Sequence, residues 1–356
     1  MINPKVSIIF DYNKYRKYRS SFSQYKELYE ITKSLNIPKL SKGERREVGK
    51  FFSNYDVQFK LNYSWHAFYS YLNGFDKRYI PIDFLFCVIV PTLNRDKWSN
   101  GYVDKNRYSD IFTGIKQPKT FFKRINGDFY IDKKIVPIGD IIDLCLSIDE
   151  SVVKPSIDTG QGKGVNIFRG REFNQAEVVN YLNTMGKDFI VQERMRSHPL
   201  ISRLNPTSLN TIRMVTYRRG NEAYILSSTM KIGKKGEIVD NGHSGGMFCG
   251  IRNGILDKYL YTLNPFTKVL NPDYPKEGEI LLPNFSILED KAKELALQLP
   301  YSRYAGWDLS IDEAGDPILI EVNLSCPGGN IMQIPNGPLF GDMTEEIMED
   351  IKLSRK

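Results

Sequence analysis

From residue 121 onward, short segments rich in apolar residues are separated by polar turn signals, a pattern that predicts strands. The expected strands span residues 121–125, 129–131, 189–193, 211–218, 223–232, 309–311 and 318–322. Asn126-Gly127 and Gly220-Asn221 lie between neighbouring strands and favour tight hairpin turns. The segment 312–317 separates the last two strands in the same way. The chain is therefore expected to build antiparallel sheets.

Helical spacing occupies both ends of the chain. Residues 12–75 predict helices rich in Tyr, Phe, Lys and Ser, with breaks at Pro38 and Gly43. A loop-rich stretch with several aromatic residues follows. Further elements are expected as helices at residues 288–299 and 343–353, an extended segment at 144–155 and a buried strand at 84–90. The expected fold class is α+β.

The composition of the 356 residues, 41% hydrophobic and 26% charged, is typical of a soluble protein with about two domains. It excludes a disordered chain, a collagen and a disulfide-stapled miniprotein. The four cysteines form no Cys-x-x-Cys pair, which argues against a zinc ribbon and favours a reducing compartment. No apolar run approaches the roughly 18 residues of a membrane-spanning helix, and Met1 is not followed by the apolar core of a secretory signal. We therefore expect a cytoplasmic protein.

The net charge of +7 is concentrated near the N-terminus. Residues 1–60 contain 13 Lys/Arg and 6 Asp/Glu, whereas the two signs balance in the rest of the chain. Tyrosines interleave with these basic positions, so the arm suits docking on nucleic acid, an anionic membrane surface or an anionic glycan. The alternative is a solvated helical face with tyrosines packed beneath it, which is favoured because no recognised nucleic-acid motif accompanies the charge.

A glycine-rich loop follows Lys154-Pro155. Gly160, Gly162 and Gly164 lie within five positions, so backbone N–H groups can approach an anion closely, and Lys154 and Lys163 add positive charge. Phosphate is the natural ligand of such a loop. However, the spacing is neither that of a P-loop nor that of a dinucleotide-binding fingerprint. The segment alone therefore indicates phosphate binding and a simple tight hairpin equally.

Two carboxylates and an amide lie close together in the last expected hairpin. Glu321 and Asn323 project to the same face of a strand because side chains alternate along it, and Asp308 on the partner strand can reach that face. Such an all-oxygen cluster suits Mg²⁺ and leaves positions for phosphates and water. The alternative is a polar hairpin with Asn323 in a turn. The loop 325–330 that follows could present N–H groups to an anion; its Cys326 has no histidine nearby in sequence and is not expected to be a nucleophile.

The order of these elements resembles the ATP-grasp superfamily of ATP-dependent carboxylate–amine ligases, over about residues 103–335. Asp308 precedes Glu321 by 13 residues and Asn323 follows two positions later, as in the D-alanine–D-alanine ligases. Lys105 precedes Lys154 by 49 residues, close to the spacing of the two phosphate-contacting lysines in those enzymes. The local sequence is similar to the sugar-transfer-associated branch, found among capsule and teichuronopeptide biosynthesis proteins. The segments that carry this likeness are Asp104-Lys105-Asn106, Gln117-Pro118, Arg124-Ile-Asn-Gly127, His198-Pro199 and Ser208-Leu-Asn210-Thr211-Ile-Arg213.

The resemblance implies a role for each matching position. For ATP it implies contacts from Lys105, Lys154, Gly160, Gly162, Lys163, Gly164, Gln192, Glu193, Met195 and His198. The two lysines before the loop would hold phosphates, the glycine-rich loop would close over them, residues 192–195 would face adenine and His198 is the candidate for ribose. Arg213 and Lys154 would act as catalytic cations, with the guanidinium fork on the γ-phosphate and the acyl phosphate. Asp308, Glu321 and Asn323 would bind one or two Mg²⁺ ions.

The resemblance also implies a domain order and a reaction. It places a basic helical region at residues 1–75, an N-terminal ATP-grasp subdomain at 76–150, an ATP-binding lid at 151–230 and a metal-binding subdomain at 231–356. In the implied reaction a carboxylate attacks the γ-phosphate, and an amine then attacks the acyl phosphate to give an amide, ADP and phosphate. The implied partners are an amino acid and an acidic sugar or related carboxylate, free or in a glycan.

Two features depart from the better-known ligases. Gly306 stands where they carry an arginine two residues before the first metal carboxylate, so the oxyanion role falls to Arg213 or to the loop 325–330. Residues 1–75 also lack the glycine-punctuated βαβ pattern of a substrate domain, so the substrate site cannot be transferred. Two alternatives to a ligase stay open, namely a sugar kinase on the same fold and a non-catalytic basic glycan- or nucleic-acid-binding module. The loop 240–246 either faces the active site or is only a turn.

Overall fold

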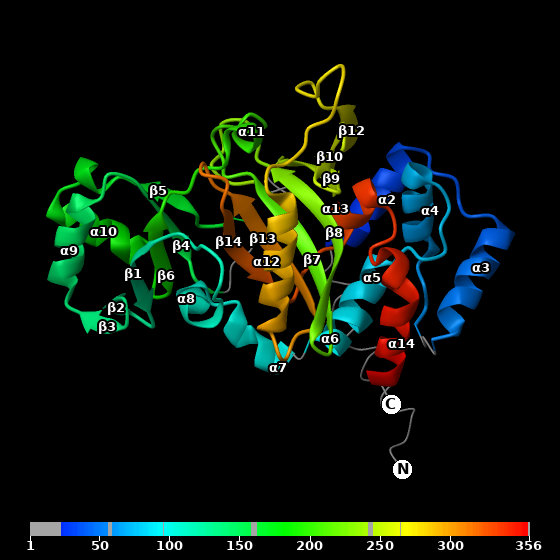
Figure 1. Cartoon of the computed structure of the whole chain (residues 1–356), viewed down its shortest axis with the longest axis horizontal. Coiled ribbons are helices and arrows are strands. Elements are labelled where there is room, and N and C mark those ends of the chain that lie inside the picture. Colours follow the sequence, from blue (N-terminus) through cyan, green and yellow to red (C-terminus); the bar gives the residue numbers. More distant parts are fainter. Residues whose placement is uncertain are drawn as a thin grey trace, which may run out of the picture.

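In the computed structural model, two antiparallel sheets follow one another along the long axis of the molecule, with helices packed against both (Figure 1). The structure describes residues 23–55, 59–94, 96–157, 162–240, 245–263 and 265–354. Much of the basic arm, including Lys14, Arg16 and Arg19, lies outside the described residues. Farther along, Arg45 and Arg46 are exposed on a helix, which fits the interpretation of a solvated face.

The first sheet has six antiparallel strands in the order β3-β2-β1-β6-β4-β5. Their bounds are β1 Thr120–Ile125, β2 Asp128–Ile131, β3 Lys134–Val136, β4 Ser151–Pro155, β5 Asn166–Phe168 and β6 Phe189–Glu193. Asn126 (φ 50°) and Gly127 (φ 98°) form the turn between β1 and β2, because a two-residue hairpin of this hand needs positive φ at both positions. Helices α9 (Ile138–Ser147) and α10 (Gln175–Thr184) pack on this sheet and share its apolar core.

The second sheet is antiparallel, with the order β12-β11-β9-β8-β7-β13-β14 and a short β10 paired to β9. Its strands are β7 Thr211–Arg219, β8 Glu222–Ile232, β9 Met247–Arg252, β10 Ile255–Leu256, β11 Tyr259–Leu263, β12 Phe266–Leu270, β13 Tyr304–Ile311 and β14 Pro317–Asn323. Helix α12 (Phe285–Leu297) covers one face (Figure 1). Ile212 and Met214 of β7 join the core under α12, whereas Val215 and Tyr217 join the core on the other face. Since helices cover both faces, β7 is buried along most of its length.

Helices from both ends of the chain form the core on that other face. The remaining helices are α2 Ser23–Ser34, α3 Lys42–Ser53, α4 Tyr63–Asn73, α5 Ile82–Phe84, α6 Val90–Leu93, α7 Asp96–Ser99, α8 Tyr108–Ile111, α11 Pro199–Ser202, α13 Asn330–Asn336 and α14 Thr344–Ser354, with a π-helical turn Leu85–Ile89 between α5 and α6. Apolar residues of α2–α6, α13 and α14 pack together against β7, β9 and β11. Helix α3 begins at a capping box, in which Ser41 and Glu44 each accept the other's backbone N–H. The described helices of the N-terminal region are therefore part of the main body of the protein.

The expected hairpins are confirmed, with β1–β2, β7–β8 and β13–β14 each paired as neighbours. Three local expectations are wrong. Residues 84–90 are helical, because a run with no polar positions fits a buried helix as well as a buried strand. Residues 144–147 complete α9, so the extended segment begins at Ser151. Gly43 lies in the first turn of α3 and does not break it.

The sheets divide the chain at other positions than the boundaries expected at 150 and 230. The first sheet runs from residue 120 to 193, because β6 pairs with both β1 and β4. The second runs from 211 to 323, because β7 and β8 form one hairpin. Separately, Cys145, Cys249 and Cys326 are free thiols. None of the described helices has the length and apolar character needed to cross a membrane.

Candidate functional site

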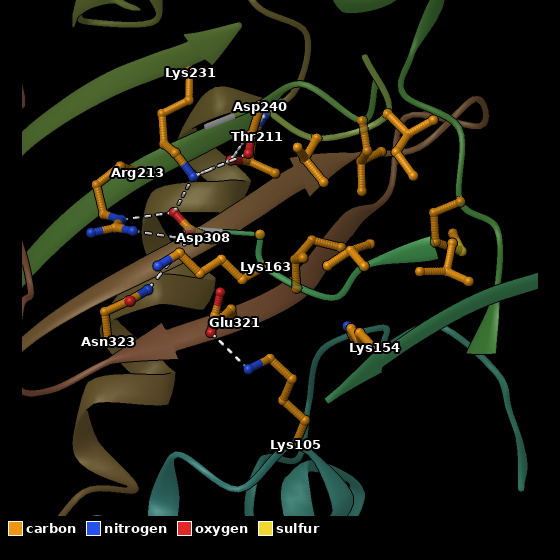
Figure 2. A pocket seen from close by; sticks show the side chains of 18 of the residues that line it. Lys105, Lys154, Lys163, Thr211, Arg213, Lys231, Asp240, Asp308, Glu321 and Asn323 are labelled. Atoms are coloured by element: carbon orange, nitrogen blue, oxygen red, sulfur yellow. Dashed lines mark hydrogen bonds and ion pairs between the residues drawn. The ribbon is translucent and has the colours of Figure 1, made fainter. Parts of the chain in front are cut away.

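A cavity of about 670 Å³ lies between the two sheets. The first sheet lines it with Lys154 of β4 and Gln192 and Glu193 of β6. The second sheet lines it with Arg213 of β7, Lys231 of β8, Asp308 of β13, and Glu321 and Asn323 of β14 (Figure 2). The expected phosphate, catalytic and metal positions thus converge on one space.

The carboxylate–amide cluster is built by strand register. Asp308 pairs directly with Glu321 across β13 and β14, and Gly306 pairs with Asn323. Paired residues share a face of a sheet, so both carboxylates project into the cavity. The Asn323 Nδ2 donates to Asp308 Oδ2 at 3.3 Å, which leaves the amide oxygen of Asn323 for another partner. The expected strand 309–311 had implied that Asp308 lies at the start of this strand. The structure instead places Asp308 in the middle of β13.

Arg213 forms a bidentate ion pair with Asp308. The Arg213 Nε donates to Asp308 Oδ1 at 2.7 Å and Nη2 donates to Oδ2 at 2.9 Å, while Nη1 donates to the carbonyl oxygen of Pro327 at 3.0 Å. Burial opposes the charge of the guanidinium, but Asp308 outweighs it and raises the pKa of Arg213. Burial likewise opposes ionisation of Asp308, yet Arg213 and Lys231 hold the pKa of that carboxyl below its usual range. Both groups are therefore charged at neutral pH, and Arg213 has a fixed orientation.

Lys231 is a site residue that the sequence analysis missed. Its Nζ lies 3.4 Å from Asp308 Oδ1 and 3.3 Å from Asp240 Oδ1, and it donates to Thr211 Oγ1 at 3.2 Å (Figure 2). Burial opposes its charge, but Asp240 and Asp308 together raise the pKa of Lys231. No sequence motif marks Lys231 as a site residue. Its position follows only from the pairing of β8 with β7.

Asp240 lies at the start of the loop 240–246 and also lines the cavity. It accepts hydrogen bonds from the backbone N–H of Thr211 at 3.0 Å and from the Thr211 hydroxyl. The first residue of this loop therefore faces the site, whereas Asn241 and His243 lie outside the described residues.

Lys105 and Lys154 approach the carboxylates from the other side. The Lys105 Nζ lies 2.9 Å from Glu321 Oε1, and the Lys105 backbone N–H donates to the carbonyl oxygen of Ser156 at 3.1 Å. Lys105 therefore bridges the first sheet to β14. Burial, with a further contribution from Lys105, lowers the pKa of Lys154 to about 8, despite the opposing effect of Glu321. An anion such as a phosphate would restore the full charge of this lysine.

Apolar side chains also line the cavity, and we call this lining the apolar slot. Met195 lines it together with Val152, Ile167, Leu209 and Ile320, and a slot of this kind suits a flat purine ring. Next to it, the Gln192 Nε2 donates to Thr120 Oγ1 at 3.2 Å, and Glu193 Oε1 accepts from the backbone N–H of Lys119 at 2.6 Å. Gln192 and Glu193 are thus held in place by their own strand neighbours.

The structure does not bring every expected nucleotide contact into the cavity. His198 does not line it, because its Nδ1 accepts from the backbone N–H of Leu200 and caps α11. Gly162 and Lys163 do line the cavity, whereas Gly164 (φ 76°) packs back on Pro155. Gly160 lies outside the described residues. The ribose role of His198 therefore finds no support in this geometry.

The residues expected to bind metal fit Mg²⁺ by donor type. Asp308 and Glu321 supply carboxylate oxygens and Asn323 supplies an amide oxygen, which are the ligands that a hard cation prefers. Among the described residues, no group of three or more His, Cys, Asp or Glu side chains gathers around one point. The donor set is therefore two carboxylates and an amide, which leaves further positions for phosphate oxygens and water.

Comparison with known proteins gives one family and several distant structures. A family described as sugar-transfer associated ATP-grasp matches residues 90–348. No curated protein matches the chain. Among solved structures, the ATP-grasp ligase PsnB complexed with minimal precursor, Mg and ADP is 10% identical, with a TM-score of 0.42, covering 73% of this chain and 62% of that one.

Two further structures are similar at the same level. D-alanyl-alanine synthetase A from Vibrio cholerae is 13% identical with a TM-score of 0.41, covering 70% of this chain and 63% of that one. The VanG D-Ala:D-Ser ligase from Enterococcus faecalis is 13% identical with a TM-score of 0.41, covering 70% and 60%. The chain thus spans somewhat less than two thirds of the length of these structures. The family match itself covers most of the sequence and includes Lys105, Lys154, Arg213 and the metal-type cluster, and on this basis the chain belongs to the sugar-transfer-associated ATP-grasp family.

Proposed function

We propose that this chain is an ATP-dependent, ADP-forming ligase that joins a carboxylate to an amine through an acyl phosphate. The observation that supports it most is the row of Glu321, Asp308 and Arg213 across three paired strands. Lys231 flanks this row, and Lys105 and Lys154 face it from the other side of the cavity. Phosphoryl transfer needs such an arrangement, because cations offset the charge of the transferring group while carboxylates hold its metal.

The proposed nucleotide position follows the lining of the cavity. Adenine would lie in the apolar slot beside Met195, and the phosphates would extend toward Lys105 and Lys154, with the loop around Gly162 and Lys163 above them. Bound Mg²⁺ would neutralise charge on the phosphate oxygens. Asp308, Glu321 and Asn323 are the residues that would hold it.

In the proposed reaction, an oxygen of the substrate carboxylate attacks the γ-phosphorus and the bond to the β-phosphate oxygen breaks, releasing ADP. The amine nitrogen then attacks the acyl carbon, loses a proton and expels phosphate. Arg213 would stabilise the charge on the transferring phosphoryl group, since Asp308 and the Pro327 carbonyl oxygen fix its orientation. No protein nucleophile is required.

For the substrates, we propose an amino acid and an acidic sugar or related carboxylate, joined during synthesis of a surface polysaccharide such as a capsule. The sugar-transfer association of the family supports this choice. Because the reaction consumes ATP, we propose that it takes place in the cytoplasm.

The test begins with calorimetric titration of a non-hydrolysable ATP analogue, with and without Mg²⁺. We expect Mg²⁺-dependent binding that is lost in Lys154→Ala and retained in Lys134→Ala, which removes an exposed lysine of the same sheet. ADP release is then measured with pairs of uronic acids and amino acids. Amide formation with ADP supports the ligase, ADP with a phosphorylated sugar points to a kinase, and no nucleotide binding by the wild type would refute both.

A further inference from the structure

The cavity also has an end, on the other side of Arg213 and Lys231 from the apolar slot, that is lined by apolar side chains. Phe248 of β9, Leu263 of β11, Phe86 and Ile331 line this part, which we call the apolar end. Phe86 and Leu263 are 7% and 6% exposed, so each keeps a small surface toward the cavity while the rest is packed in the core. None of these four side chains carries a hydrogen-bonding group.

Strand register places the apolar end directly beside the reacting groups. Lys231 of β8 pairs with Phe248 of β9, and Phe248 pairs with Tyr261 of β11. Neighbouring strands lie about 4.8 Å apart, so the sheet face changes from charged to aromatic within one strand spacing. Phe248 and Tyr261 stack, with ring centroids 5.8 Å apart, and this stacking fixes the floor of the apolar end.

The wall opposite the sheet comes from the N-terminal helices. A Cβ on Gly329 would lie 2.8 Å from Ile82 Cδ1 and 3.8 Å from Phe86 Cζ, so the bare glycine allows the loop 325–330 to touch this wall. Nearby, the amide oxygen of Asn330 already accepts a hydrogen bond from the Tyr69 hydroxyl at 2.6 Å. The wall is therefore part of the packed core; Phe86 and Ile331 present carbon to the cavity, and Asn330 is a polar residue that lines it beside them.

The lining decides which substrate group this end can accept. A sugar ring carries several hydroxyls, and each hydroxyl buried without a partner would weaken binding on the order of tenfold to a hundredfold. An aliphatic or aromatic side chain gains from the same burial. The position next to Lys231 and Arg213 suits a group attached to a carboxylate or to the atoms that react with it.

We propose that the apolar end binds the hydrophobic side chain of the amino-acid partner, and that Phe86 limits the size of that side chain. This inference rests on the proposed function, in which an amino acid is one of the two coupled molecules, and it names the class of that amino acid. The sugar partner then approaches from the polar part of the cavity.

The test is calorimetric titration of single amino acids into protein saturated with Mg²⁺ and the non-hydrolysable ATP analogue. Leucine and asparagine are nearly isosteric, as are valine and threonine, and both enantiomers of each are used. We expect the apolar member of each pair to bind at least about tenfold more tightly. Equal binding within the pairs, or no binding by any amino acid, would overturn the inference.

Two variants on adjoining helical turns separate specificity from stability. Phe86→Leu enlarges the apolar end and should raise the affinity for phenylalanine relative to leucine by about tenfold. Phe84→Leu removes a fully buried ring that does not line the cavity, so its ratio should match the wild type. An unchanged ratio in Phe86→Leu, or the same change in both variants, contradicts the role of Phe86.

ADP release with uronic acid and amino acid pairs distinguishes the two failures. If polar amino acids support ADP release as well as apolar ones, the ligase proposal stands and the inference about the apolar end is wrong. If apolar amino acids bind selectively but no pair releases ADP, the apolar end stands and the proposed ligase function is wrong.

Discussion

The pair Asp308 and Glu321 offers a sharp test of the site, because the two carboxylates share a proposed role and differ in surroundings. Asp308 is 4% exposed and contacts two buried cations, Arg213 through two hydrogen bonds and Lys231 at 3.4 Å. Glu321 keeps 30% of its side chain exposed and forms one ion pair, with Lys105. Asp308→Asn and Glu321→Gln each remove one negative charge while preserving shape.

The expected cost in stability follows from these contacts. Removing one partner of a buried ion pair costs about 3–5 kcal/mol, because the other charges stay buried without compensation. Loss of a partly exposed pair costs roughly 0–1 kcal/mol, since water solvates the remaining partner. At about 2 °C of melting temperature per kcal/mol for a chain of this size, Asp308→Asn should lower the transition by roughly 6–10 °C. Glu321→Gln should lower it by less than about 2 °C.

Thermal melts and Mg²⁺-dependent nucleotide binding are measured on both variants. The melts follow tryptophan fluorescence, to which Trp307, buried next to Asp308 in β13, contributes. We expect both variants to lose Mg²⁺-dependent binding of the ATP analogue and only Asp308→Asn to lose marked stability. Equal destabilisation by the two substitutions would refute the account of the buried charges, and normal Mg²⁺-dependent binding by Glu321→Gln would remove it from the metal site.

Three further predictions use other features of the structure. Burial and Lys105 lower the pKa of Lys154 to about 8, so affinity for the nucleotide analogue should fall between pH 7 and 9 as the lysine loses its proton. Calorimetry should show a weaker dependence of affinity on pH in Lys154→Arg, and no dependence in the wild type would contradict this role. Burial lowers the pKa of His66 from 6.5 to about 4, so the unfolded state binds the proton more readily and the free energy of unfolding should fall by about 2 kcal/mol from pH 7 to 5. The melting temperatures at the two pH values should differ less in His66→Phe than in the wild type, and the same difference in both proteins would assign the effect to other groups. A Cβ at Gly306 would lie 1.9 Å from the carbonyl oxygen of Pro327, so Gly306→Ala should cost about 1–3 kcal/mol in thermal unfolding, whereas Gly139→Ala, in open space on α9, should be neutral.

Local patterns predicted the parts of the site that one hairpin can build. The alternation in β14 placed Glu321 and Asn323 on one face, and the turn after β13 brought Asp308 opposite Glu321, as the register confirms. The hairpin of β7 and β8 could be predicted in the same way from Gly220, which takes a positive φ at the turn between them. In each case the information lies within about twenty residues of sequence.

Contacts between distant segments were not predictable in the same way. Lys231 becomes a site residue only because β7 lies between β8 and β13, which puts its ammonium within reach of Asp308. His198 carried a motif and yet caps a helix, because a nearby backbone N–H competes for its ring nitrogen. A resemblance assigns positions along a chain, whereas packing decides which side chains reach the cavity.

The N-terminal helices explain why the substrate end of the cavity could not be transferred from the resemblance. The family match begins at residue 90, whereas Ile82 and Phe86 lie before it. They lie about 240 positions before Gly329 in the chain, and neither side of this contact carries a local signal. Phe86 lies in an apolar run that fits several structures, and Gly329 lies in a loop that suggested an anion cradle. One wall of the apolar end therefore comes from outside the matched region. A change at Phe86 can alter the accepted side chain while Arg213, Lys231 and the carboxylates keep the phosphoryl chemistry.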